Sequence, residues 1–125
     1  MNKRVLLVDD EPDLNLTLKM ILEQNGFKVD SFTDPLVALE NFREEAAGMY
    51  ELLILDMKMP NMNGFELYRQ IKKIDDKVKV CFLTASEMDY GVYTDIVNSL
   101  DAEYFIRKPI DNEELVEKVN NMISS

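Results

Sequence analysis

The sequence contains no histidine and only one cysteine, Cys81. The missing histidine excludes histidine metal ligands and histidine-based catalytic triads. A single cysteine excludes an internal disulfide framework, and the apolar run around Cys81 predicts a small buried side chain. No apolar run approaches the roughly 18 residues of a membrane span. Strand-like sequence begins within a few residues of the N-terminus and leaves no room for a signal peptide, so we expect a cytoplasmic protein.

Basic residues are also few, with 14 Lys and Arg against 24 Asp and Glu and a formal net charge of −10. This balance argues against nucleic-acid binding by the domain and suits contact with cations or basic partner surfaces. The 125 residues, of which 46% are hydrophobic, are enough for one core. We therefore expect a single domain over residues 1–125, with no effector domain on this chain and no membrane partner.

Short apolar runs alternate with helical patterns along the whole chain. This alternation predicts an α/β fold in which a parallel sheet carries helices on both faces. Strands are expected at residues 4–8, 27–32, 52–56, 78–83 and 103–106, and helices after Pro12, Pro35, Asn63 and Asp111 and around 93–100.

The third helix illustrates how these helices are recognised. Asn63 can cap its first turn, and Leu67, Ile71 and Ile74 recur at the spacing of one inward helical face. The pair Asn63-Gly64 is also typical of a hairpin, but no alternating strand follows it. Asp34 and Asp111 are predicted to cap the second and the last helix in the same way.

The run Leu52 to Leu55 is continuously apolar and ends in one carboxylate, Asp56. A run without polar alternation is typical of a central strand that is buried on both faces. Open α/β sheets bind their ligands beyond the carboxyl ends of the strands. Asp56 is therefore predicted to lie where such a sheet has its functional site.

The other predicted strands also end in polar side chains, which parallel connectivity gathers at one edge. Oxygen ligands without histidine or cysteine favour a hard cation such as Mg²⁺. A hydroxyl and an ammonium in the same pocket suit the anionic oxygens of a phosphoryl group, and a carboxylate beside them can act as an in-line nucleophile. The residues are Asp9, Asp10, Asp56, Thr84 and Lys108.

Each of these residues has a plainer interpretation when it is taken alone. An acid after a strand is commonly a helix cap, Thr84 can be a turn residue, and Lys108 can be a surface charge. Their joint placement at successive strand ends argues for a site, because it is improbable that all five residues occur at strand ends by chance.

The chain resembles the receiver domains of two-component response regulators, and in particular the chemotaxis-type regulators. The resemblance covers essentially the whole chain. It implies a doubly wound, flavodoxin-like (βα)5 fold with a five-stranded parallel sheet in the order 2-1-3-4-5. It rests on Val-Asp-Asp-Glu at 8–11, Leu-Asp-Met-Lys-Met-Pro-Asn-Met-Asn-Gly at 55–64, Leu-Thr-Ala at 83–85 and Tyr-Phe-Ile-Arg-Lys-Pro at 104–109.

The resemblance implies a phosphorylation site centred on Asp56 as the phospho-accepting residue. Asp10 and Asp56 would bind Mg²⁺ directly, Asp9 would act through water, and the backbone carbonyl of Lys58 would complete the protein ligands. Thr84 resembles the switch hydroxyl that moves toward the phosphoryl group.

Residues 105–109 resemble the rest of the family's switch. Lys108 matches the lysine that pairs with a phosphoryl oxygen, Phe105 occupies the switch-aromatic position, and Pro109 stands where the family usually has a cis peptide bond. The chain departs from the pattern in having Phe105 in place of the commoner tyrosine, and Asp101 in place of the glycine after the fourth helix.

The function implied is phosphoryl transfer from a sensor histidine kinase or phosphotransfer protein, followed by a change of the surface formed by helix 4, strand 5 and helix 5. A downstream output protein would read this surface, and a phosphorylation-dependent homodimer would use it. The domain would catalyse only its own phosphotransfer and autodephosphorylation and would not otherwise be an enzyme. One alternative is a Mg²⁺-dependent phosphatase with an aspartate nucleophile, but that class has an acidic residue at the position of Lys58. The other alternative is an unphosphorylated adaptor of the same fold.

Overall fold

A computed structural model of the chain describes residues 3–44, 48–85 and 104–124. The strands are β1 (Arg4–Val8), β2 (Lys28–Phe32), β3 (Leu52–Asp56), β4 (Lys79–Thr84) and β5 (Tyr104–Arg107). The helices are α1 (Pro12–Gln24), α2 (Pro35–Glu44), α3 (Gly64–Lys72) and α5 (Asn112–Ser124). The predicted helix around residues 93–100 lies outside the described residues.

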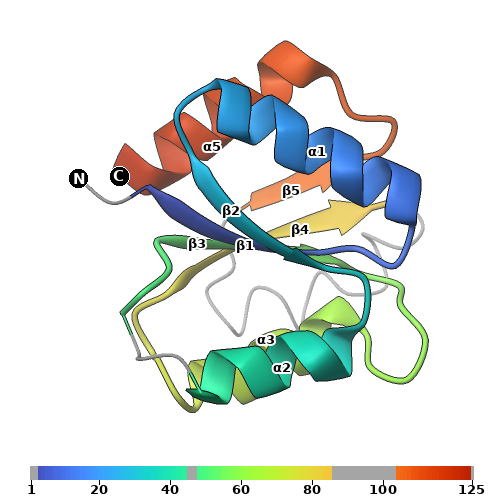
Figure 1. The fold of residues 1–125 in the computed structure, drawn as a ribbon, viewed down its shortest axis with the longest axis vertical. Helices are drawn as coiled ribbons and strands as arrows, with labels where there is room; N and C mark the ends of the chain where they lie inside the picture. Colours follow the sequence, from blue (N-terminus) through green and yellow to red (C-terminus); the bar gives the residue numbers. More distant parts are fainter. Residues whose placement is uncertain (1–2, 45–47, 86–103, 125) are drawn as a thin grey trace.

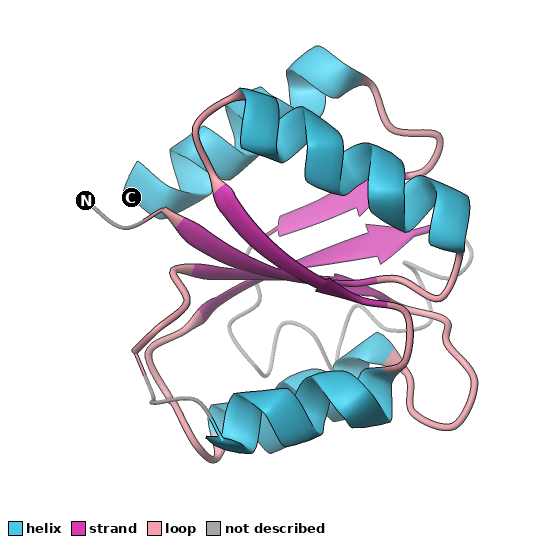
Figure 2. Cartoon of the chain, viewed as in Figure 1, coloured by secondary structure: helices cyan, strands magenta, loops and turns pink. Residues whose placement is uncertain are grey.

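The five strands form one parallel sheet in the order β2-β1-β3-β4-β5, which confirms the predicted fold class. Helices α1 and α5 cover one face of this sheet, and α2 and α3 cover the other (Figure 1). Every strand points the same way, so all the strand arrowheads lie toward one edge (Figure 2). Among the described residues, no helix combines the length and the apolar character needed to cross a membrane.

Two hydrophobic layers, one on each face, hold the helices to the sheet. Successive residues of a strand point to opposite faces, so Leu53 and Leu55 pack with α2 and α3, whereas Leu52 and Ile54 pack with α1 and α5. This division explains why the first four residues of β3, Leu52 to Leu55, are all apolar. Cys81 is fully buried in the layer under α1 and α5, as its apolar surroundings predicted.

The predicted helix caps are confirmed, and they fix where the chain leaves each strand. Asn63 Oδ1 accepts from the Glu66 N–H at 2.7 Å, and Glu66 Oε1 accepts from the Asn63 N–H at 3.1 Å, which together make a capping box. Asp34 accepts from the Leu36 N–H, and Asp111 accepts from the Glu114 N–H. The prediction that Ile74 points inward is wrong, because α3 ends at Lys72 and the Ile74 side chain is exposed.

Gly64 brings the start of α3 directly against the end of β3. Its amide donates to the carbonyl oxygen of Met57 at 3.3 Å. A Cβ atom added at this position would overlap the backbone carbonyl oxygen and carbon of Asp56. Only glycine permits this close approach, so Gly64 controls how near α3 lies to the predicted site.

Replacement of Gly64 by alanine is expected to lower the free energy of unfolding by roughly 1–3 kcal/mol, because the methyl group forces the Asp56 backbone or α3 to move. Urea unfolding gives the free energy, and amide chemical shifts at Asp56 and Met57 report the displacement.

Gly26→Ala is a suitable control, because Gly26 has a positive φ of +91° but nothing within 4 Å of an added Cβ. It should cost about 1 kcal/mol from backbone strain and leave the Asp56 amide shift in place. Equal shifts at Asp56 in both variants would refute the steric explanation.

Candidate functional site

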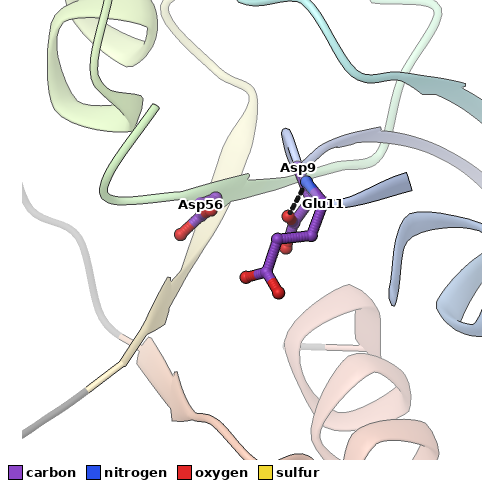
Figure 3. Close-up of side chains that lie close together, drawn as sticks. All are labelled: Asp9, Glu11 and Asp56. Carbon is purple, nitrogen blue, oxygen red and sulfur yellow. Dashed lines mark hydrogen bonds between the residues drawn. The ribbon is translucent and has the colours of Figure 1, made fainter. Parts of the chain in front are cut away.

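The carboxyl ends of four strands bring an acidic and basic cluster together. Asp9 follows β1 and Asp56 ends β3, and their side chains point into one space together with that of Glu11 (Figure 3). Thr84 ends β4, and its carbonyl oxygen accepts from the Lys108 N–H at 2.7 Å. This bond continues the pairing of β4 with β5 past the end of β5 and so holds Lys108 beside Thr84.

The Lys108 ammonium lies among three carboxylates. Its Nζ is 2.8 Å from Glu11 Oε1, 3.1 Å from Asp9 Oδ2 and 3.3 Å from Asp56 Oδ2. Burial opposes the charge of Lys108, but the hydrogen bond to Glu11 and the charges of Asp56 and Asp9 raise its pKa above the ordinary value. The ammonium is therefore fully charged at neutral pH.

Asp9 is fully buried, and its two oxygens have different surroundings. Oδ1 accepts from the Glu11 N–H at 2.9 Å. Oδ2 lies within ion-pair distance of Lys108 but accepts no hydrogen bond from any described residue. Burial raises the pKa of Asp9, although the Glu11 N–H and Lys108 act in the opposite direction. An oxygen of this kind is suited to a cation or to a water molecule that a cation holds.

The pKa of Asp56 is shifted more strongly than the pKa of Asp9. Burial, the negative charge of Asp9 and a side-chain hydrogen bond with Asp10 raise its pKa to about 7, against the pull of Lys108. Asp10 is half-buried, and its side chain contributes to the raised pKa of Asp56. The Lys58 N–H lies 3.4 Å from Asp56 Oδ1, which leaves Oδ1 and Oδ2 in different environments.

The site therefore has the donors that a hard divalent cation needs. One oxygen each from Asp9, Glu11 and Asp56 lies within 4.8 Å of the others. All of them are carboxylate oxygens, which suit Mg²⁺ better than a softer metal. The Asp9 Oδ2 accepts no hydrogen bond from a described residue, and burial together with the charge of Asp9 raises the pKa of Asp56, so a bound cation would stabilise both carboxylates in their ionised form.

The remaining predicted residues lie on β4, on β5 and on the loops that follow β3 and β5. Thr84 is buried, and Lys58 lies on the loop after β3 with an exposed side chain. The half-buried Phe105 packs its ring against Phe82, with the ring centroids 5.9 Å apart. The peptide bond between Lys108 and Pro109 is cis.

Two residues of the site were not predicted from the sequence. Glu11 belonged to the motif at 8–11 but was not assigned a role, although its carboxylate makes the shortest contact to Lys108. Asn15 is buried in α1, and its Nδ2 donates to the Asp9 carbonyl at 3.0 Å and to the Phe32 carbonyl at 2.8 Å. Its spacing of three and seven residues from Leu18 and Leu22 places a polar side chain on the buried face, which is the signal that could have identified it.

Known proteins resemble the chain over most of its length. A family model described as the response regulator receiver domain matches residues 5–120. The sporulation initiation phosphotransferase F of Bacillus subtilis is 30% identical over 125 residues, which cover 98% of this chain and 95% of that protein. The CpxR homolog of Haemophilus influenzae, a transcriptional regulatory protein, is 32% identical over 120 residues, 96% of this chain but only 50% of that protein.

Solved structures agree with these matches. The response regulator TrrA from Thermotoga maritima, in complex with Mg²⁺-BeF, is 33% identical and has a TM-score of 0.80, with 96% of this chain and 98% of that chain covered. The chain thus spans about half the length of some curated relatives and nearly all of others. With its parallel sheet and its acidic site beside Lys108, the chain belongs to the response regulator receiver domains of two-component systems.

Proposed function

We propose that this receiver domain accepts a phosphoryl group on Asp56. The observation that carries the proposal is the position of Asp56, a buried carboxylate whose Oδ2 lies 3.3 Å from Lys108 within an acidic cluster. The 125 residues contain no histidine, so a phosphohistidine donor lies outside them, and we propose that a sensor histidine kinase or a phosphotransfer protein supplies it.

In this reaction a carboxylate oxygen of Asp56 attacks phosphorus in line with the bond to the donor nitrogen. That bond breaks, the donor imidazole keeps the electron pair and takes up a proton, and Asp56 becomes an aspartyl phosphate. Asp56 attacks only when it is ionised. Since burial raises its pKa to about 7, positive charge nearby favours the reactive form.

The ligands proposed for Mg²⁺ are Asp10, Asp56 and the Lys58 carbonyl, with Asp9 acting through water. Bound Mg²⁺ would neutralise the developing charge on the phosphoryl oxygens. The buried carboxylates of Asp9 and Asp56, and the Asp9 Oδ2 that accepts no hydrogen bond from a described residue, support a cation at this position, and the similar Thermotoga protein is solved with Mg²⁺-BeF. Asp10 and the Lys58 carbonyl are proposed from the resemblance to the family.

Lys108 and Thr84 are proposed to hold two other phosphoryl oxygens. An ammonium and a hydroxyl at the same strand ends suit the charge of roughly −1.5 to −2 that phosphorylation adds. Movement of Thr84 toward this charge would open space beside β4 for Phe105. The half-buried position of Phe105 against Phe82 is consistent with two positions for this ring.

The proposed output is a change in the surface that includes β5 and α5, together with the predicted fourth helix. A downstream protein would bind this surface, or two copies of the chain would pair through it. The domain is a signalling module, and we propose that its catalysis extends only to its own phosphorylation and autodephosphorylation. A phosphatase acting through Asp56 is disfavoured because Lys58 stands where that class needs an acid.

With Mg²⁺ and acetyl phosphate, the protein is expected to gain the mass of one phosphoryl group, labile to hydroxylamine as an acyl phosphate is. Asp56→Asn should abolish the gain, since the amide is not a nucleophile here. Lys108→Met should slow it by about 10- to 100-fold, because one charged donor to the phosphoryl group is lost. Intact-protein mass spectrometry measures all three.

Asp13→Asn is the matched control for the loss of one carboxylate, because Asp13 is exposed in the first turn of α1 and outside the site. The Asp13→Asn variant should be phosphorylated by acetyl phosphate at the same rate as the parent protein. Labelling of Asp56→Asn at the parent rate would refute the assignment of the acceptor, and sustained release of phosphate from phosphate monoesters would favour the phosphatase.

Stability should also depend on pH through Asp56. Its native pKa of about 7 lies above the ordinary value of 3.8, so the native state binds more protons than the unfolded state between these values. The contribution of Asp56 to stability therefore falls as pH rises from about 4 to about 7. Asp56→Asn should raise the free energy of unfolding at about pH 8 by on the order of 3 kcal/mol, and by much less at about pH 5.

Chemical unfolding of both proteins without divalent cations measures this difference, and added Mg²⁺ should reduce it by stabilising the parent more than Asp56→Asn. A difference that stays constant between the two pH values would contradict the raised pKa of Asp56.

A further inference from the structure

Of the three carboxylates around Lys108, Glu11 makes the shortest contact to its ammonium. The distance from Lys108 Nζ to Glu11 Oε1 is 2.8 Å, against 3.1 Å to Asp9 and 3.3 Å to Asp56. Within the described residues, only the contact to Glu11 also has the geometry of a hydrogen bond. The carboxylate oxygen nearest to the Lys108 ammonium thus belongs to a residue other than the predicted phospho-acceptor.

The start of α1 leaves the Glu11 carboxylate available for this contact. Glu11 occupies the N-cap position of α1, but its side chain makes no capping hydrogen bond. Pro12, the first residue of the helix, has no N–H, so the start of α1 has one donor fewer that needs a partner. The Glu11 backbone N–H instead donates to Asp9 Oδ1 at 2.9 Å, which fixes the loop so that the side chain reaches across to Lys108.

We propose that Glu11 is a positioning residue that holds Lys108 in the unphosphorylated protein and competes with the phosphoryl group for it. The proposal rests on the function proposed above. A phosphoryl group on Asp56 must draw the ammonium toward its own oxygens, and each hydrogen bond that Lys108 keeps with Glu11 weakens that pairing. Glu11 therefore lowers the affinity of the site for a phosphoryl group.

The expected effect is modest, because 61% of the Glu11 side-chain surface is exposed whereas Lys108 is 14% exposed. Ion pairs of this exposure correspond to a change of about threefold in an equilibrium constant. Two contributions must be separated, the hydrogen bond to Lys108 and the general repulsion between the Glu11 charge and an anion.

The first experiment tests the contact in the protein without ligand. A trace amount of acetic anhydride at about pH 9 acylates lysines in proportion to their free amine, and peptide mass spectrometry gives the reactivity of Lys108 relative to the exposed Lys28. Glu11→Gln should raise the relative reactivity of Lys108 about threefold. Glu23→Gln, an exposed change of equal charge at the far end of α1, should leave it at the parent value.

The second experiment measures competition directly, with beryllofluoride as a phosphoryl mimic and Mg²⁺ at a concentration that saturates each variant, so that a change in Mg²⁺ affinity on loss of the Glu11 carboxylate does not contribute. Calorimetry should show about threefold tighter binding for Glu11→Gln than for the parent, and a smaller gain for Glu11→Asp, which keeps the charge on a shorter side chain. In the Lys108→Met background, Glu11→Gln should have a smaller effect, because only the general repulsion remains to be removed.

The outcomes distinguish this proposal from the one on which it rests. If beryllofluoride binds the parent and not Asp56→Asn, but Glu11→Gln changes neither Lys108 reactivity nor affinity, the role of Glu11 is refuted and the phosphoryl site stands. An equal gain in affinity with and without Lys108 also refutes it, since repulsion alone then accounts for the effect. Failure of the parent to bind beryllofluoride would overturn both proposals.

Discussion

The central constraint on this molecule is the placing of several carboxylates around one ammonium in a largely buried space. Lys108 lies within 3.3 Å of oxygens from Asp9, Glu11 and Asp56, so it offsets part of their repulsion. The offset is incomplete, because burial and mutual repulsion still raise the pKa values of Asp9 and Asp56. A bound cation would therefore stabilise the folded protein at the point where a phosphoryl group would be transferred.

The sheet tolerates this unfavourable cluster because the rest of the fold is firmly packed around it. Each central strand contributes side chains to hydrophobic layers on both faces, which leaves its carboxyl end as the place for polar groups. Backbone bonds beyond the strand ends then fix the geometry. Lys108 is tied to Thr84, and Asn15 in α1 ties the carbonyl of Asp9 to that of Phe32, so the site depends on main-chain contacts as much as on its charged groups.

Much of this arrangement could be predicted from the sequence, and the exceptions have physical reasons. Apolar runs gave the sheet, capping residues gave the starts of the helices, and parallel connectivity placed Asp9, Asp56, Thr84 and Lys108 at one edge. Ile74 was mispredicted because periodicity does not show where a helix ends. The roles of Glu11 and Gly64 were not predicted because they depend on three-dimensional distances, one to a side chain distant in sequence and one to the Asp56 backbone.

The contact between Gly64 and the Asp56 carbonyl also has a genetic consequence. Every amino acid except glycine carries a Cβ, so every missense change at this codon introduces the same overlap, whatever the chemistry of the new side chain. Tolerance at position 64 should therefore be uniformly low in a library of variants, whereas tolerance at position 11 should follow the charge and length of the side chain. The two positions border the same site, yet a substitution acts at position 64 through the volume of its Cβ and at position 11 through the charge and reach of its side chain.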